Sequence, residues 1–334
     1  MRQSGPKFHI DYHDFTLEVH VIGYRTKGES IVVLFKEGQR TFYSMVIDCY
    51  GKKKGRATIN KTTDILVRNG VTSLPMIIMT HPHEDHINGI KSLIDKFCDD
   101  KTMFYSSTHS FDINNQTVKL TKQEVKLLRL VRAINEKKKT FSNVIGVSSE
   151  GHVSLRNIYL YDNIDCDEQN PIIIEVNALT PITSINDAKR INKDLDPNDL
   201  SIAIILCICD YYFLFGADMT DDHIDYLDSE TMSAVRFLKI PHHASDTSSH
   251  LVHFFLRDQL DYACSTSYHI GRSHLPLKTI LQQYSAVSKR VDVLGCKSDD
   301  KRKGAFGEIC YQFTLGPYDM LSQVQYEGVV RRVH

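Results

Sequence analysis

One short segment of the sequence concentrates residue types that bind metal ions. Residues 80–89 read THPHEDHING, so His81, His83, Asp85 and His86 fall within six residues. In an extended chain residues i and i+2 point the same way, so His81 and His83 can present two imidazoles to one ion. The chain then turns into a predicted helix, where Asp85 and His86 can bind a second ion. Imidazole and carboxylate ligands suit Zn²⁺, and also Mn²⁺ or iron.

Three further segments place polar residues directly after predicted buried strands. They are FLFGAD, ending at Asp218, LKIPHHASDTS, containing His242 and His243, and RSHLP, containing His274. Each is weak evidence alone, because a strand-terminal turn and a pair of core histidines are both common. Functional sites gather at strand ends, however, so together these segments predict one site at a sheet edge.

The elements that must position these residues follow from the apolar patterning. Strands are predicted over 16–22, 30–35, 41–47, 76–80, 103–106, 172–176, 201–209, 211–215, 234–240, 262–265, 290–294 and around 308–315. Helices are predicted over 59–69, 87–97, 121–138, around 221–229, 248–257 and 276–285. Strands first and alternating elements afterwards indicate an α/β (α+β) fold with two mixed sheets and outer helices. We expect one domain over 1–334, a core of about 16–316, and polar insertions near 107–170 and 183–198.

The composition excludes several classes of protein. The chain has 334 residues, a net charge of −1, 42% hydrophobic and 24% charged residues, which excludes disordered, collagen-like and coiled-coil chains. No apolar run reaches the length of a membrane helix and no apolar segment marks a secretory signal, so we expect no membrane partner. Eight scattered cysteines in a large chain indicate reduced thiols and a cytoplasmic location.

The sequences of these segments and their order along the chain resemble those of the metallo-β-lactamase fold superfamily. Within it, they resemble the C-terminal hydrolase domain of ComEC-type competence proteins. The matching text, over about 20–315, is TKGESIVVLF, VIDCY, HPHEDHINGI, NDLSIAIIL, FLFGAD, LKIPHHASDTS and RSHLP. This chain has His83 and Ala244 where that branch commonly has Asp and Gly. The resemblance implies an αββα sandwich. We expect a stand-alone hydrolase, because the membrane channel of those proteins is absent.

The resemblance also implies a role for each residue. The implied ligands of two divalent ions, Zn²⁺ or Mn²⁺, are His81, His83, Asp85, His86, Asp218 and His243, with Asp218 bridging the ions. Asp48 would hold a ligand imidazole by accepting its other N–H. Asp85 and His242 would be the catalytic groups that move the proton, and His274 would face the substrate. The choice between His242 and His243 as ligand stays open, with His243 favoured.

Two adjacent ions activate water and neutralise charge on a substrate, which hydrolyses phosphodiesters but also esters and lactams. Lys52, Lys53 and Lys54 follow Asp48 closely and predict a basic rim, although a solvated charge run is an equal alternative. Ser245 and Thr247 offer hydroxyl donors to phosphate oxygens. We expect a phosphodiesterase or nuclease acting on nucleic acid or nucleotides. A lactonase, a phosphorylcholine-type esterase and, less favoured, a non-catalytic binding module remain alternatives.

Overall fold

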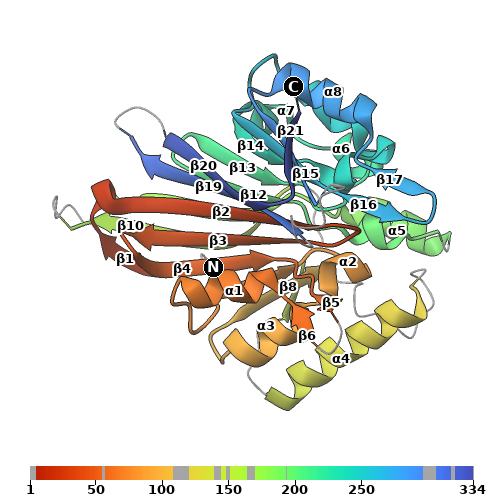
Figure 1. The fold of residues 1–334 in the computed structure, drawn as a ribbon, viewed down its shortest axis with the longest axis horizontal. Helices are drawn as coiled ribbons and strands as arrows, with labels where there is room; N and C mark the ends of the chain where they lie inside the picture. The colour runs from red at the N-terminus through yellow and green to blue at the C-terminus, as the bar shows by residue number, and fades with distance from the viewer. Residues whose placement is uncertain are drawn as a thin grey trace.

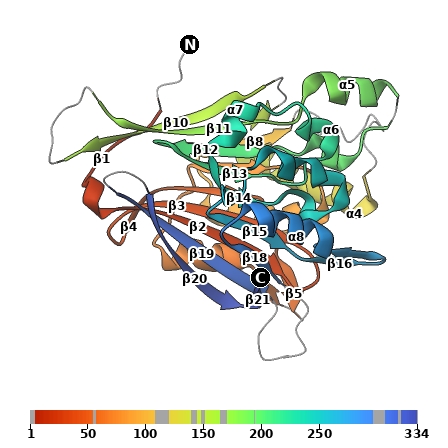
Figure 2. The same ribbon diagram turned by 90° about the horizontal axis from the view of Figure 1, so that it is seen from above.

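The chain folds into two large mixed sheets that lie face to face, with helices on both outer faces (Figures 1 and 2). The computed structural model describes residues 5–54, 57–107, 120–138, 144–147, 151–163, 170–192, 194–295, 306–316 and 320–333. The α/β architecture expected from the sequence, with two mixed sheets flanked by helices, is confirmed.

The eight-stranded sheet combines the N-terminal half with two strands near the C-terminus. Its strands in spatial order are β20 (Met320–Gly328), β19 (Phe306–Leu315), β2 (Phe15–Tyr24), β3 (Glu29–Glu37), β4 (Arg40–Ile47), β7 (Met76–Met79), β8 (Met103–Ser107) and β9 (Val144–Val147). Neighbours are antiparallel from β20 to β4 and parallel from β4 to β9. Side chains alternate along a strand, so on β2 Leu17 and Val19 enter the core while Glu18 and His20 lie on the outer face.

The nine-stranded sheet holds the remaining long strands. In spatial order they are β1 (Lys7–Ile10), β10 (Val153–Asp162), β11 (Ile172–Ala178), β12 (Ile204–Ile208), β13 (Tyr211–Phe215), β14 (Val235–Lys239), β15 (Tyr262–Thr266), β18 (Val291–Leu294) and β21 (Val330–Val333). The pairs from β13 to β18 are parallel. Strands β12 and β13 are almost continuously apolar because both faces of this sheet are covered.

Apolar side chains from both sheets fill the space between them. Phe213 of one sheet and Phe313 of the other meet edge to face, with ring centroids 4.8 Å apart. Phe237 and Tyr311 repeat this cross-sheet contact at 5.0 Å. All four rings are fully buried. Such aromatic pairs fix how the two sheets face each other, and therefore how their strand ends align.

Helices cover the outer face of each sheet. On the eight-stranded sheet lie α1 (Lys61–Arg68), α2 (Glu84–Ile87), α3 (Ile90–Phe97) and α4 (Lys122–Lys138). On the nine-stranded sheet lie α6 (Asp221–Ile224), α7 (Ser229–Ser233), α8 (Lys278–Val287) and the 3₁₀ segment Asp246–Phe254. The buried residues of α3, which include Ile90, Leu93 and Phe97, recur at helical spacing, as packing on a sheet requires. Within the described ranges, no helix is long and apolar enough to cross a membrane.

Two local expectations were wrong. Residues 52–54, which lie outside every predicted strand, form β5 (Lys52–Lys54), which pairs with β6 (Ala57–Ile59). The region 248–257, expected as an α-helix, lies mainly in the 3₁₀ segment Asp246–Phe254. Ser248 explains this difference, because its hydroxyl donates to the Pro241 and Ser245 carbonyls and its backbone is not helical.

The two expected polar insertions contain regular structure. Region 183–198 holds α5 (Thr183–Ile191), and the 3₁₀ segment Pro197–Leu200 follows it. Region 107–170 holds α4, β9 and β10, and β10 pairs with both β1 and β11 inside the nine-stranded sheet. Residues 108–119, 139–143, 148–150 and 164–169 of this region lie outside the described ranges. Polar sequence here therefore marks half-exposed strands and helices as well as loops.

Candidate metal centre

Four chain segments meet where neighbouring strands of the two sheets end. Asp48 follows β4, and the segment 81–86 follows the adjacent parallel strand β7. Asp218 follows β13, and His243 follows the adjacent parallel strand β14. Parallel neighbours end at the same edge of their sheet, and the two sheets face each other, so all four segments converge.

The carboxylate of Asp218 lies among three imidazoles. Its Oδ2 is 3.7 Å from His81 Nε2, 3.5 Å from His86 Nε2 and 3.9 Å from His243 Nε2. Asp85 closes the other side, with Oδ2 at 3.6 Å from His86 Nε2 and 3.3 Å from His243 Nε2. The five side chains are buried, and their donor atoms face a common space.

His83 joins this group from its rim. Its Nδ1 lies 3.1 Å from His81 Nε2, and the donor atoms of His81, His83 and Asp218 lie within 4.8 Å of one another. The structure therefore brings together all six residues expected as ligands. They divide into a His81–His83 side and an Asp85–His86–His243 side, with Asp218 between them.

The donor atoms of this group fit a divalent metal. His86 Nε2, His243 Nε2 and Asp218 Oδ1 are buried and have no hydrogen-bond partner, and an unsatisfied buried polar atom costs about 1–3 kcal/mol. Most of the separations between donor atoms exceed a hydrogen bond, whereas two ligands bonded to one zinc ion at about 2.0–2.2 Å lie roughly 3.3 Å apart. Imidazole nitrogens and carboxylate oxygens are also the chemical types that such ions prefer.

Asp48 orients His86 from behind. Its Oδ2 lies 2.7 Å from His86 Nδ1, so Nδ1–H donates to the carboxylate and Nε2 presents its lone pair to the centre. Thr80 donates to both Asp48 oxygens, from its backbone N–H at 2.8 Å and from its hydroxyl at 2.6 Å. Asp48 therefore lies one hydrogen bond behind the His86 imidazole.

A second support, which the sequence analysis did not find, lies behind His243. Its Nδ1 donates to Thr266 Oγ1 at 2.8 Å, and that hydroxyl donates to Glu29 Oε2 at 2.5 Å. Lys239 Nζ lies 2.8 Å from the same oxygen. The only signals in the sequence are charges beside or inside apolar runs: Glu29 directly precedes SIVVLF, and Lys239 interrupts the run FLKI.

The pKa values follow from burial and from the charges around each group. Burial opposes ionisation of Asp85 and Asp218, but the charge of His86, followed by contacts with His243, outweighs burial and lowers both pKa values. Burial, together with nearby charges, lowers the pKa of His81 and of His242. Burial opposes protonation of His86 and His243, but the charge of Asp218 and contacts with the other carboxylates outweigh it and raise both pKa values. Because imidazoles bind metals in the neutral form, these two rings would release a proton when an ion binds.

The backbone is strained around this centre. Asp48, Ala217, His242, His243 and Ala244 all have positive φ, between 45° and 58°. Such conformations cost about 1–3 kcal/mol each for residues other than glycine and collect at functional sites. At Ala244, where glycine is common in the resembled branch, φ is 58°. The turns after β4, β13 and β14 therefore accept strain to hold the side chains in place.

A cleft of about 640 Å³ opens over the centre. Asp85, Asp218 and His243 lie in it, and its walls include His242, Ser245, Tyr268, His274, Lys27 and Arg272. His274 comes from β17 (Ser273–Leu275), which forms a hairpin with β16 (Tyr268–Ile270). The expected substrate residues His274 and Ser245 therefore line the cleft, and Arg272 and Lys27 are lining cations that the sequence analysis did not identify.

Other expected substrate residues lie elsewhere. Thr247 is not among the lining residues, and its hydroxyl lies 2.7 Å from His242 Nδ1. Lys52, in β5, is half-buried and also not among them, and burial lowers its pKa. The side chains of Lys53 and Lys54 lie outside the described part of the chain. Thr247 thus contacts the cleft through His242 and Ser245, which both line it.

Comparison with models of protein families and with curated protein sequences gives no match. Solved structures that are similar to this chain include two enzymes. A diphosphatase from the PhnP family is 11% identical, with a TM-score of 0.38, over 83% of this chain and 85% of its own. The DIM-1 metallo-β-lactamase, exposed to ceftazidime, is 14% identical, with a TM-score of 0.29, over 85% and 98%.

Proposed function

We propose that this protein is a metal-dependent hydrolase of the metallo-β-lactamase type that cleaves phosphodiesters. One observation carries the proposal: the Asp218 carboxylate lies 3.5–3.9 Å from three imidazole nitrogens, and two of these nitrogens are buried without a hydrogen-bond partner. A cluster of this kind is costly to fold unless it holds cations.

Two divalent ions, Zn²⁺ or Mn²⁺, would occupy the centre. His81 and His83 would hold one ion, Asp85, His86 and His243 the other, and Asp218 would contact both. When bound, such ions supply Lewis-acid activation of water and neutralise charge on a phosphoryl group. Asp48 keeps the His86 ring in the required tautomer, and Thr266 does the same for His243.

His242 is the better of the two proposed proton-transfer groups. Asp85 has a lowered pKa, which makes it a good ligand and a poor base. Burial holds the pKa of His242 below its usual value, so the ring is neutral near pH 7 and can accept a proton. It lines the cleft, and Thr247 fixes its orientation through Nδ1.

The walls of the cleft carry donors that an anionic substrate such as a phosphodiester would use, beside the carboxylates of Glu124 and Asp246. Arg272, His274 and Ser245 supply donors at the mouth, and Lys27 adds a cation that is paired with Glu84 at 2.6 Å. A lactone or thioester does not require these cations. We therefore propose nucleic acid or a nucleotide as substrate and DNA as the first polymer to test. The six cysteines of the described ranges form no disulfide, which supports a reducing, cytoplasmic setting.

Hydrolysis of bis-p-nitrophenyl phosphate with Zn²⁺ or Mn²⁺ tests this proposal. The wild type should turn over the diester, Asp218→Asn should abolish turnover, and Asp210→Asn, a change at the exposed turn between β12 and β13, should leave it intact. The same protein is then offered DNA, RNA, cyclic nucleotides and lactones. Metal-dependent opening of lactones with no phosphodiester cleaved would favour a lactonase. Bound metal without any turnover would favour a binding module.

A further inference from the structure

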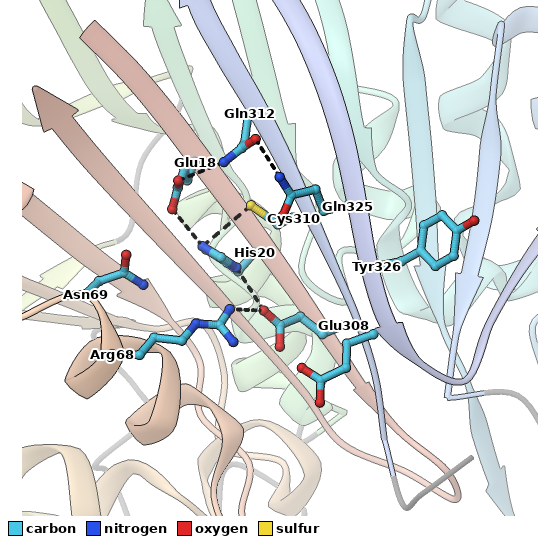
Figure 3. Close-up of a pocket in the computed structure, with 10 residues that line it drawn as sticks. Glu18, His20, Arg68, Asn69, Glu308, Cys310, Gln312, Gln325 and Tyr326 are labelled. Carbon is cyan, nitrogen blue, oxygen red and sulfur yellow. Dashed lines mark hydrogen bonds and ion pairs between the residues drawn. The ribbon is translucent and has the colours of Figure 1, made fainter. Parts of the chain in front are cut away.

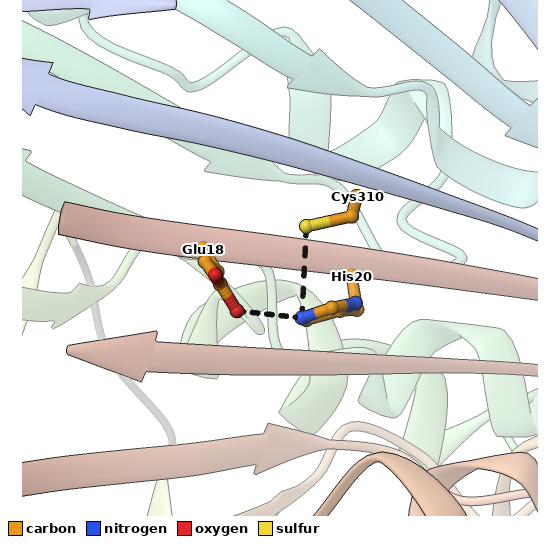
Figure 4. A group of neighbouring side chains, drawn as sticks. All are labelled: Glu18, His20 and Cys310. Atoms are coloured by element: carbon orange, nitrogen blue, oxygen red, sulfur yellow. Dashed lines mark hydrogen bonds and ion pairs between the residues drawn. The ribbon is translucent and has the colours of Figure 1, made fainter. Parts of the chain in front are cut away.

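A second cluster of possible ligands lies on the outer face of the eight-stranded sheet, away from the cleft. It consists of Glu18 and His20 on β2 and Cys310 on β19 (Figure 4). Each of these residues is at most 7% exposed. Their donor atoms, a carboxylate oxygen, an imidazole nitrogen and a thiol sulfur, lie within 4.8 Å of one another. The proposed function uses none of them.

The strand register brings the three residues together. His20 is directly opposite Cys310 in the antiparallel pair of β2 and β19, and Glu18 is opposite Gln312. Residues i and i+2 of a strand share a face, so Glu18 and His20 both point to the outer side beside Cys310. The arrangement thus rests on two long regular strands rather than on loops.

The distances match the edges of a zinc coordination shell. His20 Nε2 is 3.2 Å from Glu18 Oε2 and 3.6 Å from Cys310 Sγ. With Zn–N and Zn–O bonds of about 2.0–2.2 Å and Zn–S of about 2.3 Å, tetrahedral geometry separates N from O by roughly 3.3 Å and N from S by roughly 3.6 Å. As a hydrogen bond, by contrast, the contact between Nε2 and Oε2 is at the long limit.

Neighbouring groups already hold the other side of two of the three ligands, His20 and Glu18. Glu308 Oε1 lies 3.0 Å from His20 Nδ1 and is itself held by Arg68 of α1 at 2.5 Å (Figure 3). A carboxylate on the distal nitrogen is the usual partner of a metal-binding histidine. Glu18 Oε1 accepts from Lys36 at 3.1 Å and from Gln312 at 2.9 Å. Glu18 Oε2, His20 Nε2 and the thiol therefore point at one another.

We propose that Glu18, His20 and Cys310 form a zinc site, distinct from the proposed catalytic centre, that ties β2 to β19. A thiolate is a soft ligand that favours Zn²⁺ over Mg²⁺ or Mn²⁺. Binding displaces the thiol proton and the proton on His20 Nε2, and the charges of Glu18 and the thiolate balance the ion. The cluster borders a cavity of about 270 Å³, which leaves room for a water as fourth ligand.

The competing interpretation is a buried ion-pair network without metal. An imidazolium at His20 would then bridge Glu18 and Glu308 through its two N–H groups. That network gives the Cys310 thiol no role, because it needs no ligand at this position. The two interpretations therefore differ in whether the sulfur becomes a bound thiolate.

Cobalt substitution distinguishes them. Co²⁺ bound by a thiolate absorbs strongly in the near ultraviolet through charge transfer from sulfur, whereas the ligands proposed for the catalytic centre are only nitrogen and oxygen. Wild-type protein loaded with Co²⁺ should show this band, Cys310→Ser should lose it, and Cys209→Ser, a change at an exposed turn, should keep it. By elemental analysis, Cys310→Ser should also hold about one zinc fewer per chain than wild type.

Absence of the band in the wild type overturns the proposal without any variant having to fold. Persistence of the band in Cys310→Ser overturns it as well, because the thiolate would then belong to another cysteine. Neither readout depends on hydrolysis, so the site can stand or fall independently of the proposed function.

Discussion

The proposed catalytic centre and the β2–β19 cluster both bury histidines among carboxylates, yet the chain builds them differently. The centre lies at strand ends, on strained turns, and leaves several donor atoms without partners. The cluster lies within regular strands, and each of its histidine nitrogens has a carboxylate within 3.2 Å. Backbone strain and unpartnered donor atoms at an open cleft indicate a catalytic role. A group of paired side chains on the face of a sheet indicates a role in stabilising the fold.

Removing a ligand of the centre should have the largest effect and should separate the two regions. His86→Ala takes away the imidazole that faces both Asp85 and Asp218, so diester turnover should fall about 10³-fold, the scale for losing a major electrostatic contribution. Asp85→Ala should behave alike, and each variant should lose one ion by elemental analysis. The cobalt–thiolate band should remain. If His86→Ala also loses that band, the two sites are not independent.

Replacing Glu29, which holds Thr266 behind His243, should have a smaller effect, on metal affinity at the centre. Glu29→Gln weakens the hold on Thr266, so metal affinity at the centre should fall about 10–100-fold, as for other groups behind a ligand. Chelator competition measures this. The change also leaves Lys239 buried beside a neutral amide, so Glu29→Gln/Lys239→Met, which removes the unpaired charge, should recover stability but not affinity. Glu37→Gln, at the far end of β3, is the control. Unchanged affinity would make Glu29 a purely structural residue.

The residues that meet at the proposed centre can be found from the sequence because they are close together or follow recognisable strands. His81 to His86 form one contiguous motif, and Asp218 and His243 each follow an apolar run that is predicted as a strand. The two-sheet architecture follows from the same runs. Asp48 is predictable only from the resemblance, because a single aspartate after a strand has no distinctive chemistry.

The remaining features depend on pairing between distant strands, which sequence patterns do not show. Glu29 and Thr266 are 237 residues apart, and His20 and Cys310 are 290 apart. Along β2 the alternation of apolar and polar residues is typical of a half-exposed strand, in which Glu18 and His20 would face solvent. Only the antiparallel register of β2 and β19, together with α1 beside them, turns that polar face into a buried group.

Positive charge near the cleft should affect polymers more than small substrates. Arg272 lines the cleft, so Arg272→Ala should raise the KM for DNA roughly tenfold and reduce the slope of log affinity against log salt by about 1.

Replacing Lys52, Lys53 and Lys54 together by Ala should weaken DNA binding and flatten its salt dependence, while small-diester hydrolysis and metal content stay unchanged. If the triple variant cuts DNA like wild type at every salt concentration, β5 is a solvated strand.

The smallest expected effect concerns stability, and it tests whether the β2–β19 cluster ties the sheet together. Zinc at ~100 times its Kd stabilises a binding site by about 2.7 kcal/mol. Unfolding entropy is about 2.1 cal/mol/K per residue, so over 334 residues this shift corresponds to roughly 4 °C in Tm. Zinc should therefore raise the Tm of wild type and of Cys209→Ser by about 4 °C more than that of Cys310→Ser. Because ions at the catalytic centre stabilise all three proteins alike, the difference isolates the cluster. Equal shifts would mean that no zinc binds between β2 and β19.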